Sequence, residues 1–342
     1  MKKKNDVNNS QFFWSTAKDY LNHYLTDIRK SSVNTVSAYR HALNYFIDYL
    51  VHEKQYNRKE ISFQVFNRIN IKDYMGWMLN KKNLSPKTCN LRLTAAHALM
   101  EYASQESLEL MSYYMEVCTV KAVKTQKKPI EYFNNIEMAA LLSSPDTEKA
   151  SERRNQMMLI FLYDTAARVS EMLDIKIRDI HLNVEPAYVT VCGKGRKYRN
   201  IPLMEKSKKH LDSYLREFQA IYSPDEALFY ATTHGKKHPL SADTVEKMLK
   251  RYAVKCKNAG QDMPASVHCH MIRKTRAMDL YQQGMPLPHI QQLLGHESMS
   301  TTSGFYAFAT LDTLAKSLEI ANTSHTDKKW HNEEVMEKLY RL

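Results

Sequence analysis

Glycine and proline are scarce in this chain, with 8 and 10 residues among 342. Because both residue types interrupt helices and form tight turns, their scarcity indicates a mostly helical fold. The five cysteines are odd in number and form no Cys-x-x-Cys pair, which argues against a disulfide framework and predicts a reduced, cytoplasmic protein. No apolar run follows the basic N-terminus or approaches the roughly 18 residues of a membrane span, so neither a secretory signal nor a membrane segment is predicted.

Two common devices of phosphate chemistry are also missing. There is no Walker A loop of the form Gly-x4-Gly-Lys-Ser/Thr, and no convincing carboxylate cluster that would hold Mg²⁺. Cys269 lies between His268 and His270, but adjacent residues rarely converge on one metal ion and no second ligand pair occurs. We therefore expect no cofactor and no metal site.

Positive charge, in contrast, is abundant in both halves of the chain. The sequence has 49 Lys and Arg against 37 Asp and Glu, a net charge of +12. Residues 1–121 contain 17 basic and 11 acidic residues, so half of the excess lies there and half in 122–342. This distribution suits a protein that contacts one long polyanion with both parts, although a solvated lysine surface would give the same composition.

The length and the hydrophobic pattern predict two domains. Residues 1–121 read as a helical bundle, with apolar stripes over about 11–30, 34–52, 70–80 and 107–119 and a further helix opened by Ser85 and Pro86. Residues 122–130 are basic, end near Pro129 and predict a linker.

The second domain is expected over 131–322. Helices are predicted at about 134–143, 151–164, 205–220, 241–258, 270–283, 286–294 and 303–319. The segments 187–192 and 197–203 read as strands joined around Gly193 and Gly195, which predicts a β-hairpin. The tail, 323–342, ends in a short amphipathic helix that we expect to contact a neighbouring protomer.

Six scattered polar residues together supply what a metal-free attack on a phosphodiester requires. They are Arg168, Lys194, His270, Arg273, His296 and Tyr306. Two arginines neutralise and hold a phosphate, and a lysine and two histidines donate hydrogen bonds or move protons. A tyrosine forms a covalent ester with the phosphate, which conserves the bond energy so that strand joining needs no ATP.

Each of these residues also has an ordinary structural explanation. Arg168 follows a largely apolar helix and could simply pair with Glu171, three residues on. Lys194 could be a solvated turn lysine, and His296 could cap the helix that ends at Gly295. The remaining histidine and arginine could be a surface pair on one helix face, and the tyrosine is one of 21.

In this order the residues resemble the tyrosine recombinase (phage integrase) family, whose pattern is Arg…Lys…His-x-x-Arg…His…Tyr. Segments 32–39 and 84–93 also resemble its helical core-binding domain. The resemblance implies a mostly α fold with a small β-hairpin (α+β), in which the core-binding and catalytic domains form a C-shaped clamp on DNA. It implies that the scissile phosphate is activated by Arg168, Lys194, His270, Arg273 and His296, that Glu171 supports the first arginine, and that Tyr306 is the nucleophile.

The resemblance further implies a site-specific recombinase or integrase that forms a 3′-phosphotyrosyl intermediate without metal or ATP. It would serve integration, excision or transposition of a mobile element in the bacterial cytoplasm or nucleoid. Its partners would be double-stranded DNA with paired inverted half-sites, further copies of the chain (a dimer on each site, a tetramer in the synapse) and an accessory directionality protein. The alternatives are a type IB topoisomerase-like enzyme and a non-catalytic DNA-binding regulator of the same fold.

The chain departs from the family pattern at three points. Ala167 stands where the family usually has glycine directly before the first arginine, and Lys274 stands where a histidine often follows the second. The spacing from His296 to Tyr306 is one residue longer than in many relatives, and Gly304 offers a place to absorb it. These departures concern the local geometry of the site.

Overall fold

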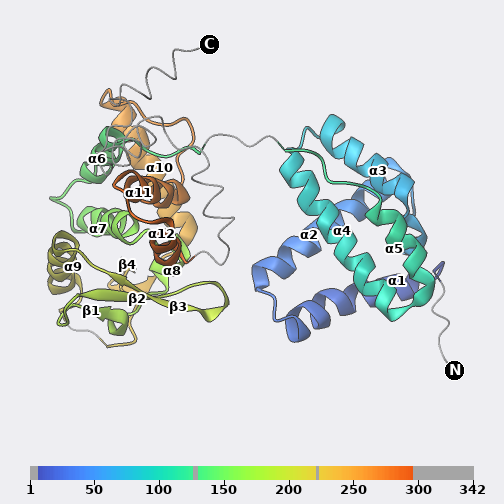
Figure 1. Cartoon of the computed structure of the whole chain (residues 1–342), viewed down its shortest axis with the longest axis horizontal. Coiled ribbons are helices and arrows are strands. Elements are labelled where there is room, and N and C mark those ends of the chain that lie inside the picture. The colour runs from blue at the N-terminus through green and yellow to red at the C-terminus, as the bar shows by residue number, and fades with distance from the viewer. Residues whose placement is uncertain (1–6, 126–129, 221–222, 296–342) are drawn as a thin grey trace, which may run out of the picture. The chain divides into compact units, whose positions relative to one another are not determined.

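The computed structural model describes residues 7–125, 130–220 and 223–295, and it divides the chain into two compact units, Met1–Lys128 and Pro129–Leu342 (Figure 1). The division falls inside the linker predicted at 122–130. The N-terminal unit is helical, and the C-terminal unit adds two small antiparallel sheets to its helices, so the predicted α+β class is confirmed. None of the helices in these ranges is long and apolar enough to cross a membrane. The predicted helix 303–319 and the tail 323–342 lie outside the described residues, and the clamp stays a prediction.

The N-terminal unit contains the five predicted helical segments. They are α1 (Ser10–Asp19) with its π-helical continuation (Tyr20–Ile28), α2 (Val33–Glu53), α3 (Arg68–Gly76) with its continuation (Trp77–Lys81), α4 (Pro86–Glu106) and α5 (Met111–Cys118). The last is shorter than predicted, because a separate 3₁₀ turn, Leu108–Leu110, precedes it. Ser85 accepts a hydrogen bond from the Thr88 N–H and Pro86 occupies the first turn of α4, as the sequence predicts.

Aromatic side chains fill the core of this unit. Phe13, Phe46, Phe63, Phe66 and Tyr74 are all at most 1% exposed. The rings of Phe46 and Tyr74 meet edge to face with centroids 4.9 Å apart, a geometry that adds to the energy of burial. The aromatic residues of residues 1–121 are thus mainly structural.

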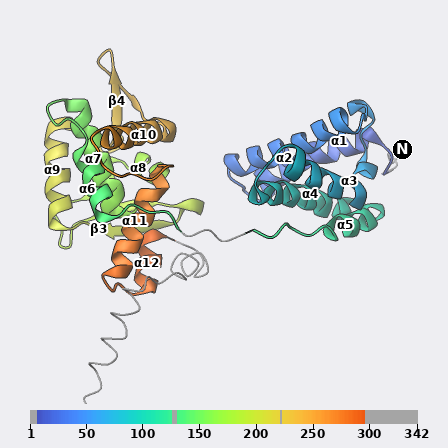
Figure 2. The same cartoon turned by 90° about the horizontal axis from the view of Figure 1, so that it is seen from above.

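The C-terminal unit follows the predicted order of helices and strands. Its helices are α6 (Asn135–Ser143), α7 (Ala150–Thr165), α8 (Val169–Leu173), α9 (Glu205–Phe218), α10 (Ala242–Asn258), α11 (Cys269–Gln282) and α12 (Leu287–Leu294). The predicted hairpin is present as β2 (Tyr188–Cys192) and β3 (Tyr198–Pro202), with β1 (Ile180–His181) added at its edge. The sequence did not predict α8, β1 or a second hairpin, made of β4 (Tyr230–Thr233) and β5 (Lys236–Pro239), that projects beyond α10 (Figure 2).

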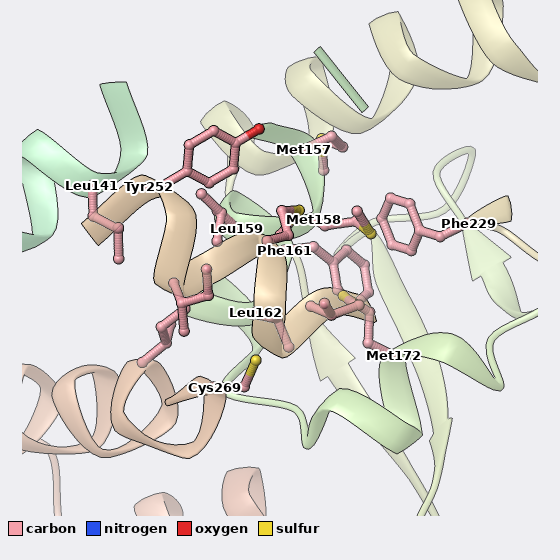
Figure 3. Close-up of a cluster of buried hydrophobic side chains, with 14 of the residues drawn as sticks. Leu141, Met157, Met158, Leu159, Phe161, Leu162, Met172, Phe229, Tyr252 and Cys269 are labelled. Carbon is pink, nitrogen blue, oxygen red and sulfur yellow. The ribbon is translucent and has the colours of Figure 1, made fainter. Parts of the chain in front are cut away.

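Helix α7 runs through the middle of this unit, with α6, α9 and α11 packed around it (Figure 1). Figure 3 shows its apolar side chains meeting residues from α8, α10 and α11: Met157, Met158, Leu159, Phe161, Leu162, Met172, Tyr252 and Cys269. The helix ends because Ala166 adopts the left-handed conformation, with φ of 50°. The chain therefore turns sharply there and enters α8 at Arg168.

Candidate active site

Glu171 is the centre of the candidate site. Its side chain is only 4% exposed, and it lies in the first turn of α8, where Arg168 is the N-cap. The Arg168 guanidinium donates from Nη1 to Glu171 Oε1 at 2.6 Å, and the Arg168 backbone N–H donates to Oε2 at 2.9 Å. The pairing expected from the sequence is therefore present. It holds the Arg168 side chain, which is 36% exposed, beside the buried Glu171 carboxylate.

Arg273 reaches the same carboxylate from α11. Its side chain is 3% exposed, and Nη1 lies 3.9 Å from Glu171 Oε2. Nη1 also donates to the Ala166 carbonyl at 2.7 Å, and Nη2 donates to the Leu294 carbonyl at 2.5 Å. This arginine joins the left-handed turn after α7 to the end of α12, and the main-chain carbonyls compensate for much of the lost hydration of its charge.

Arg199 is a third member of the cluster, and sequence reasoning missed it. It comes from β3 and donates to both Glu171 oxygens, at 3.2 Å from Nη1 and 2.8 Å from Nη2. One signal in the sequence points to it. Side chains two residues apart on a strand share a face, so Arg199 faces the same way as Ile201, which is fully buried. An arginine on the buried face of a strand indicates an anionic partner.

The charges of this cluster fix the ionisation of Glu171. Burial acts to raise the pKa of its carboxyl, but the hydrogen bonds and charges of Arg199 and Arg168 outweigh burial and hold the pKa at about 2. Glu171 is thus a carboxylate at neutral pH. One negative charge faces three guanidinium groups, so these four side chains together carry a net charge of +2.

His270 lies in the first turn of α11, three residues before Arg273, as predicted. Although the residue is exposed, its neighbours remove part of the hydration of the ring. This partial burial, together with the charges of Arg273 and Lys274, lowers the pKa of the imidazole to about 4. His270 is therefore neutral near pH 7 and has a nitrogen available to accept a proton. Lys274, one of the departures from the family pattern, adds to this effect.

The remaining predicted residues are placed only in part. Lys194 begins the 3₁₀ turn Lys194–Arg196 at the tip of the β2–β3 hairpin, where Gly195 adopts φ of 74°. Gly295 ends α12 in the left-handed conformation, as predicted, one residue before His296. His296 and Tyr306 themselves lie outside the described residues. The structure thus brings Arg168, Glu171 and Arg273 together and adds Arg199.

Cys269, which the sequence placed between two histidines, lies in the core. Its thiol pKa is raised by burial, and its backbone N–H donates to Glu246 Oε2 at 2.9 Å. Across residues 7–125, 130–220 and 223–295, no group of three or more His, Cys, Asp or Glu residues is arranged to hold a metal ion. Metal independence of the reaction stays a prediction.

With the geometry in place, comparison with known proteins assigns the family. Residues 131–311 match the family model described as the phage integrase family, and residues 17–107 match the model described as the phage integrase N-terminal SAM-like domain. The chain belongs to the phage integrase family. These tyrosine recombinases are DNA strand-cleaving and rejoining enzymes that act in site-specific recombination, and the family predicted from the residue pattern is confirmed.

Similarity to phage integrase relatives extends over most of the chain. The Sinorhizobium fredii protein named integrase/recombinase y4rC is 28% identical over 297 residues, which cover 86% of this chain and 87% of that protein. Tyrosine recombinase XerD of Staphylococcus aureus is 28% identical over 278 residues, covering 79% of this chain and 86% of XerD.

Two solved structures share the fold. XerH recombinase bound to palindromic difH substrate has a TM-score of 0.67 at 21% identity, covering 92% of this chain and 85% of XerH. Tn1549 transposon integrase in complex with transposon right end DNA has a TM-score of 0.66 at 19% identity, covering 86% of this chain and 97% of that one. These matches establish that the integrase architecture extends beyond the catalytic domain.

Proposed function

We propose that this chain is a site-specific recombinase that cleaves DNA through a covalent 3′-phosphotyrosyl bond to Tyr306, for integration, excision or transposition of a mobile element. The observation that carries the proposal is the Glu171 cluster. One buried carboxylate orients Arg168 and lies beside Arg273, and the excess positive charge is suited to a phosphate. The Tn1549 integrase similarity supports the mobile-element role.

In the proposed reaction, Arg168 and Arg273 neutralise the scissile phosphate, whose negative charge grows in the transition state. The Tyr306 hydroxyl attacks phosphorus and gives its proton to the His270 imidazole, which is neutral at pH 7 because its pKa is about 4. The bond from phosphorus to the 5′-oxygen breaks, and Lys194 donates a proton to that oxygen. His296 donates a hydrogen bond to the phosphate, and a 5′-hydroxyl from a second strand later reverses the step.

The same residues make a metal ion and a nucleotide unnecessary in this scheme. Guanidinium groups provide the positive charge that Mg²⁺ would otherwise supply, and the phosphotyrosyl ester retains the energy of the cleaved bond. Cleavage is therefore expected to survive excess chelator in the absence of ATP.

Duplex DNA is the proposed partner of the N-terminal unit as well. A groove at the start of α4 is lined by Ser85, Pro86, Lys87, Asn90, Leu91, Thr94, Lys124 and Thr125, and its two lysines suit phosphate oxygens. XerH and Tn1549 integrase are seen with DNA, and lambda integrase is seen as a tetramer on a Holliday junction. We propose that this chain likewise binds DNA with paired inverted half-sites, as a dimer on each site. Two such dimers would form a synaptic tetramer joined through residues 323–342, and an accessory directionality protein would be a further partner.

Covalent capture tests the proposal. A nicked duplex carrying a sequence selected by the full chain from a random pool should give a protein–DNA adduct that resists denaturant. Tyr306→Phe should bind this duplex normally and give no adduct, because phenylalanine has no nucleophile. An adduct of normal yield in the variant would remove Tyr306 from the role.

The alternatives give other results in the same assay. A non-catalytic DNA-binding regulator would bind the duplex without any adduct. A type IB topoisomerase-like enzyme would form the adduct and relax supercoiled plasmid, but would not bring two sites together.

A further inference from the structure

Arg199 joins three elements of the C-terminal unit. It lies on β3, its Nη1 and Nη2 bind the Glu171 carboxylate on α8, and its Nε donates to the Leu293 carbonyl of α12 at 2.9 Å. The side chain is 12% exposed, so these bonds lie largely out of water. A planar guanidinium with donors on three nitrogens can make all of these bonds at once, whereas a lysine ammonium is a single point of charge.

Two glycines pack directly against this guanidinium. A Cβ at Gly295 would lie 3.0 Å from Arg199 Nη1 and 3.2 Å from its Cζ. A Cβ at Gly193 would lie 3.3 Å from the same Nη1. Each glycine immediately precedes a residue with a proposed catalytic role, Lys194 in the hairpin turn and His296 after α12. Arg199 therefore lies against both Gly193 and Gly295, the backbone positions that lead to those two residues.

Arg199 also shares its carboxylate with the phosphate-binding arginines. Glu171 Oε1 accepts from both Arg199 and Arg168, and Oε2 lies 2.8 Å from Arg199 and 3.9 Å from Arg273. A shift of the Arg199 fork would therefore move the acceptor that orients Arg168. Arg199 is not required to neutralise Glu171, because Arg168 and Arg273 already place two positive charges beside that carboxylate.

We propose that Arg199 is a positioning residue for DNA cleavage, which fixes the Lys194 turn and the end of α12 relative to the Glu171–Arg168 pair. It acts through these groups and contacts no substrate. This inference rests on the proposed function. It predicts that DNA cleavage needs the geometry of the Arg199 guanidinium, and not only its positive charge.

The test compares single-turnover adduct formation by the full chain, Arg199→Ala and Arg199→Lys on the selected nicked duplex. Arg154→Ala is the matched control, because Arg154 is also partly buried in the C-terminal unit and bonds a backbone carbonyl, that of Tyr230, without touching Glu171. Thermal unfolding is measured for all four proteins. A second duplex replaces the bridging 5′-oxygen with sulfur, a leaving group that needs no proton.

On the ordinary duplex at saturating DNA, we expect Arg199→Ala to form adduct roughly 100-fold more slowly than the wild type, because a misplacement of about 1 Å can have an effect of that size. Arg199→Lys should remain at least about tenfold slower than the wild type. The sulfur duplex should recover at least about tenfold of the Arg199→Ala defect, because the misplaced Lys194 is then not required. Arg154→Ala should cleave at the wild-type rate even if it melts earlier.

Three results would overturn the role of Arg199. Wild-type cleavage by Arg199→Lys would show that charge alone suffices. An equal defect on both duplexes, or a defect matched by Arg154→Ala at the same loss of stability, would show a purely structural role. Absence of adduct from the unmodified chain would instead overturn the proposed function, and the role of Arg199 with it.

Discussion

The two units of this protein bury different kinds of residue. Within residues 7–125, the buried polar residues are uncharged: Thr16, Ser62, Asn70, Ser104 and Ser107. Among its described residues, the C-terminal unit buries three acidic or basic side chains, Glu171, Arg273 and Asp279. In the N-terminal unit, ion pairs such as Lys54 with Asp73 and Arg58 with Asp48 lie toward the surface.

This difference indicates what each interior is for. Removing charges from water costs several kcal/mol per ion, and apolar replacements of buried ion pairs are often as stable or more stable. An aromatic core such as that around Phe46 is sufficient to hold a helical unit together. The charges around Glu171 therefore support the proposed phosphate chemistry, because stability alone does not require them.

The largest effect is expected from removing Arg273. Arg273→Ala leaves the Ala166 and Leu294 carbonyls without this donor, so the free energy of unfolding of the C-terminal unit should fall by about 3–5 kcal/mol. Urea denaturation measures this loss, and adduct formation should also disappear. Leu99→Ala is the control from the N-terminal unit, where a cavity alone should cost about 2–5 kcal/mol without slowing cleavage at saturating DNA. Equal unfolding curves for Arg273→Ala and the wild type would contradict the claim that the C-terminal unit depends on a buried arginine.

The helices and part of the candidate site could be predicted from the sequence, but the burial of charge in the C-terminal unit could not. Apolar periodicity and the Ser85–Pro86 cap predict the helices of the N-terminal unit because they are local signals. The pairing of Arg168 with Glu171 and the helical spacing of His270 and Arg273 are also local, and the structure contains both.

The rest depends on contacts between distant parts of the chain. Arg199 meets Glu171 only after β3 folds back onto α8, a separation of 28 residues. The five-residue helix α8 is too short to give a periodic signal, and the exposed β4–β5 hairpin has no apolar alternation. The left-handed residue before Arg168 is Ala166, whereas the sequence directed attention to Ala167.

A smaller effect is expected in the pH dependence of cleavage. Because the pKa of His270 is lowered to about 4, the neutral base persists as the pH falls and is lost only near that value. The ratio kcat/KM, which reports groups in the free enzyme, should then stay within about twofold between pH 7.5 and 5.5. An imidazole with the ordinary pKa of about 6.5 would instead lose about tenfold by pH 5.5. The lowered pKa would be contradicted if kcat/KM of the wild type fell about tenfold by pH 5.5 and this pH dependence disappeared in His270→Asn.

The smallest effect concerns the turn that presents Ala166 to Arg273. A left-handed alanine costs about 1–2 kcal/mol of backbone strain, and glycine relieves it at some cost in chain entropy. Ala166→Gly should therefore raise the free energy of unfolding of the C-terminal unit by roughly 0.5–1 kcal/mol in urea denaturation. Ala167→Gly is the matched control and should lower it by a similar amount. A destabilised Ala166→Gly protein would show that this turn is not strained.

Arg168→Lys provides the most direct test of whether the buried charges serve cleavage. The Arg168 side chain is 36% exposed, so a lysine there should change the free energy of unfolding by less than about 1 kcal/mol. Lysine keeps the charge but loses the paired hydrogen bonds to phosphate, and single-turnover adduct formation should slow roughly 100- to 1000-fold. A stable Arg168→Lys protein that forms adduct at the wild-type rate would contradict the account.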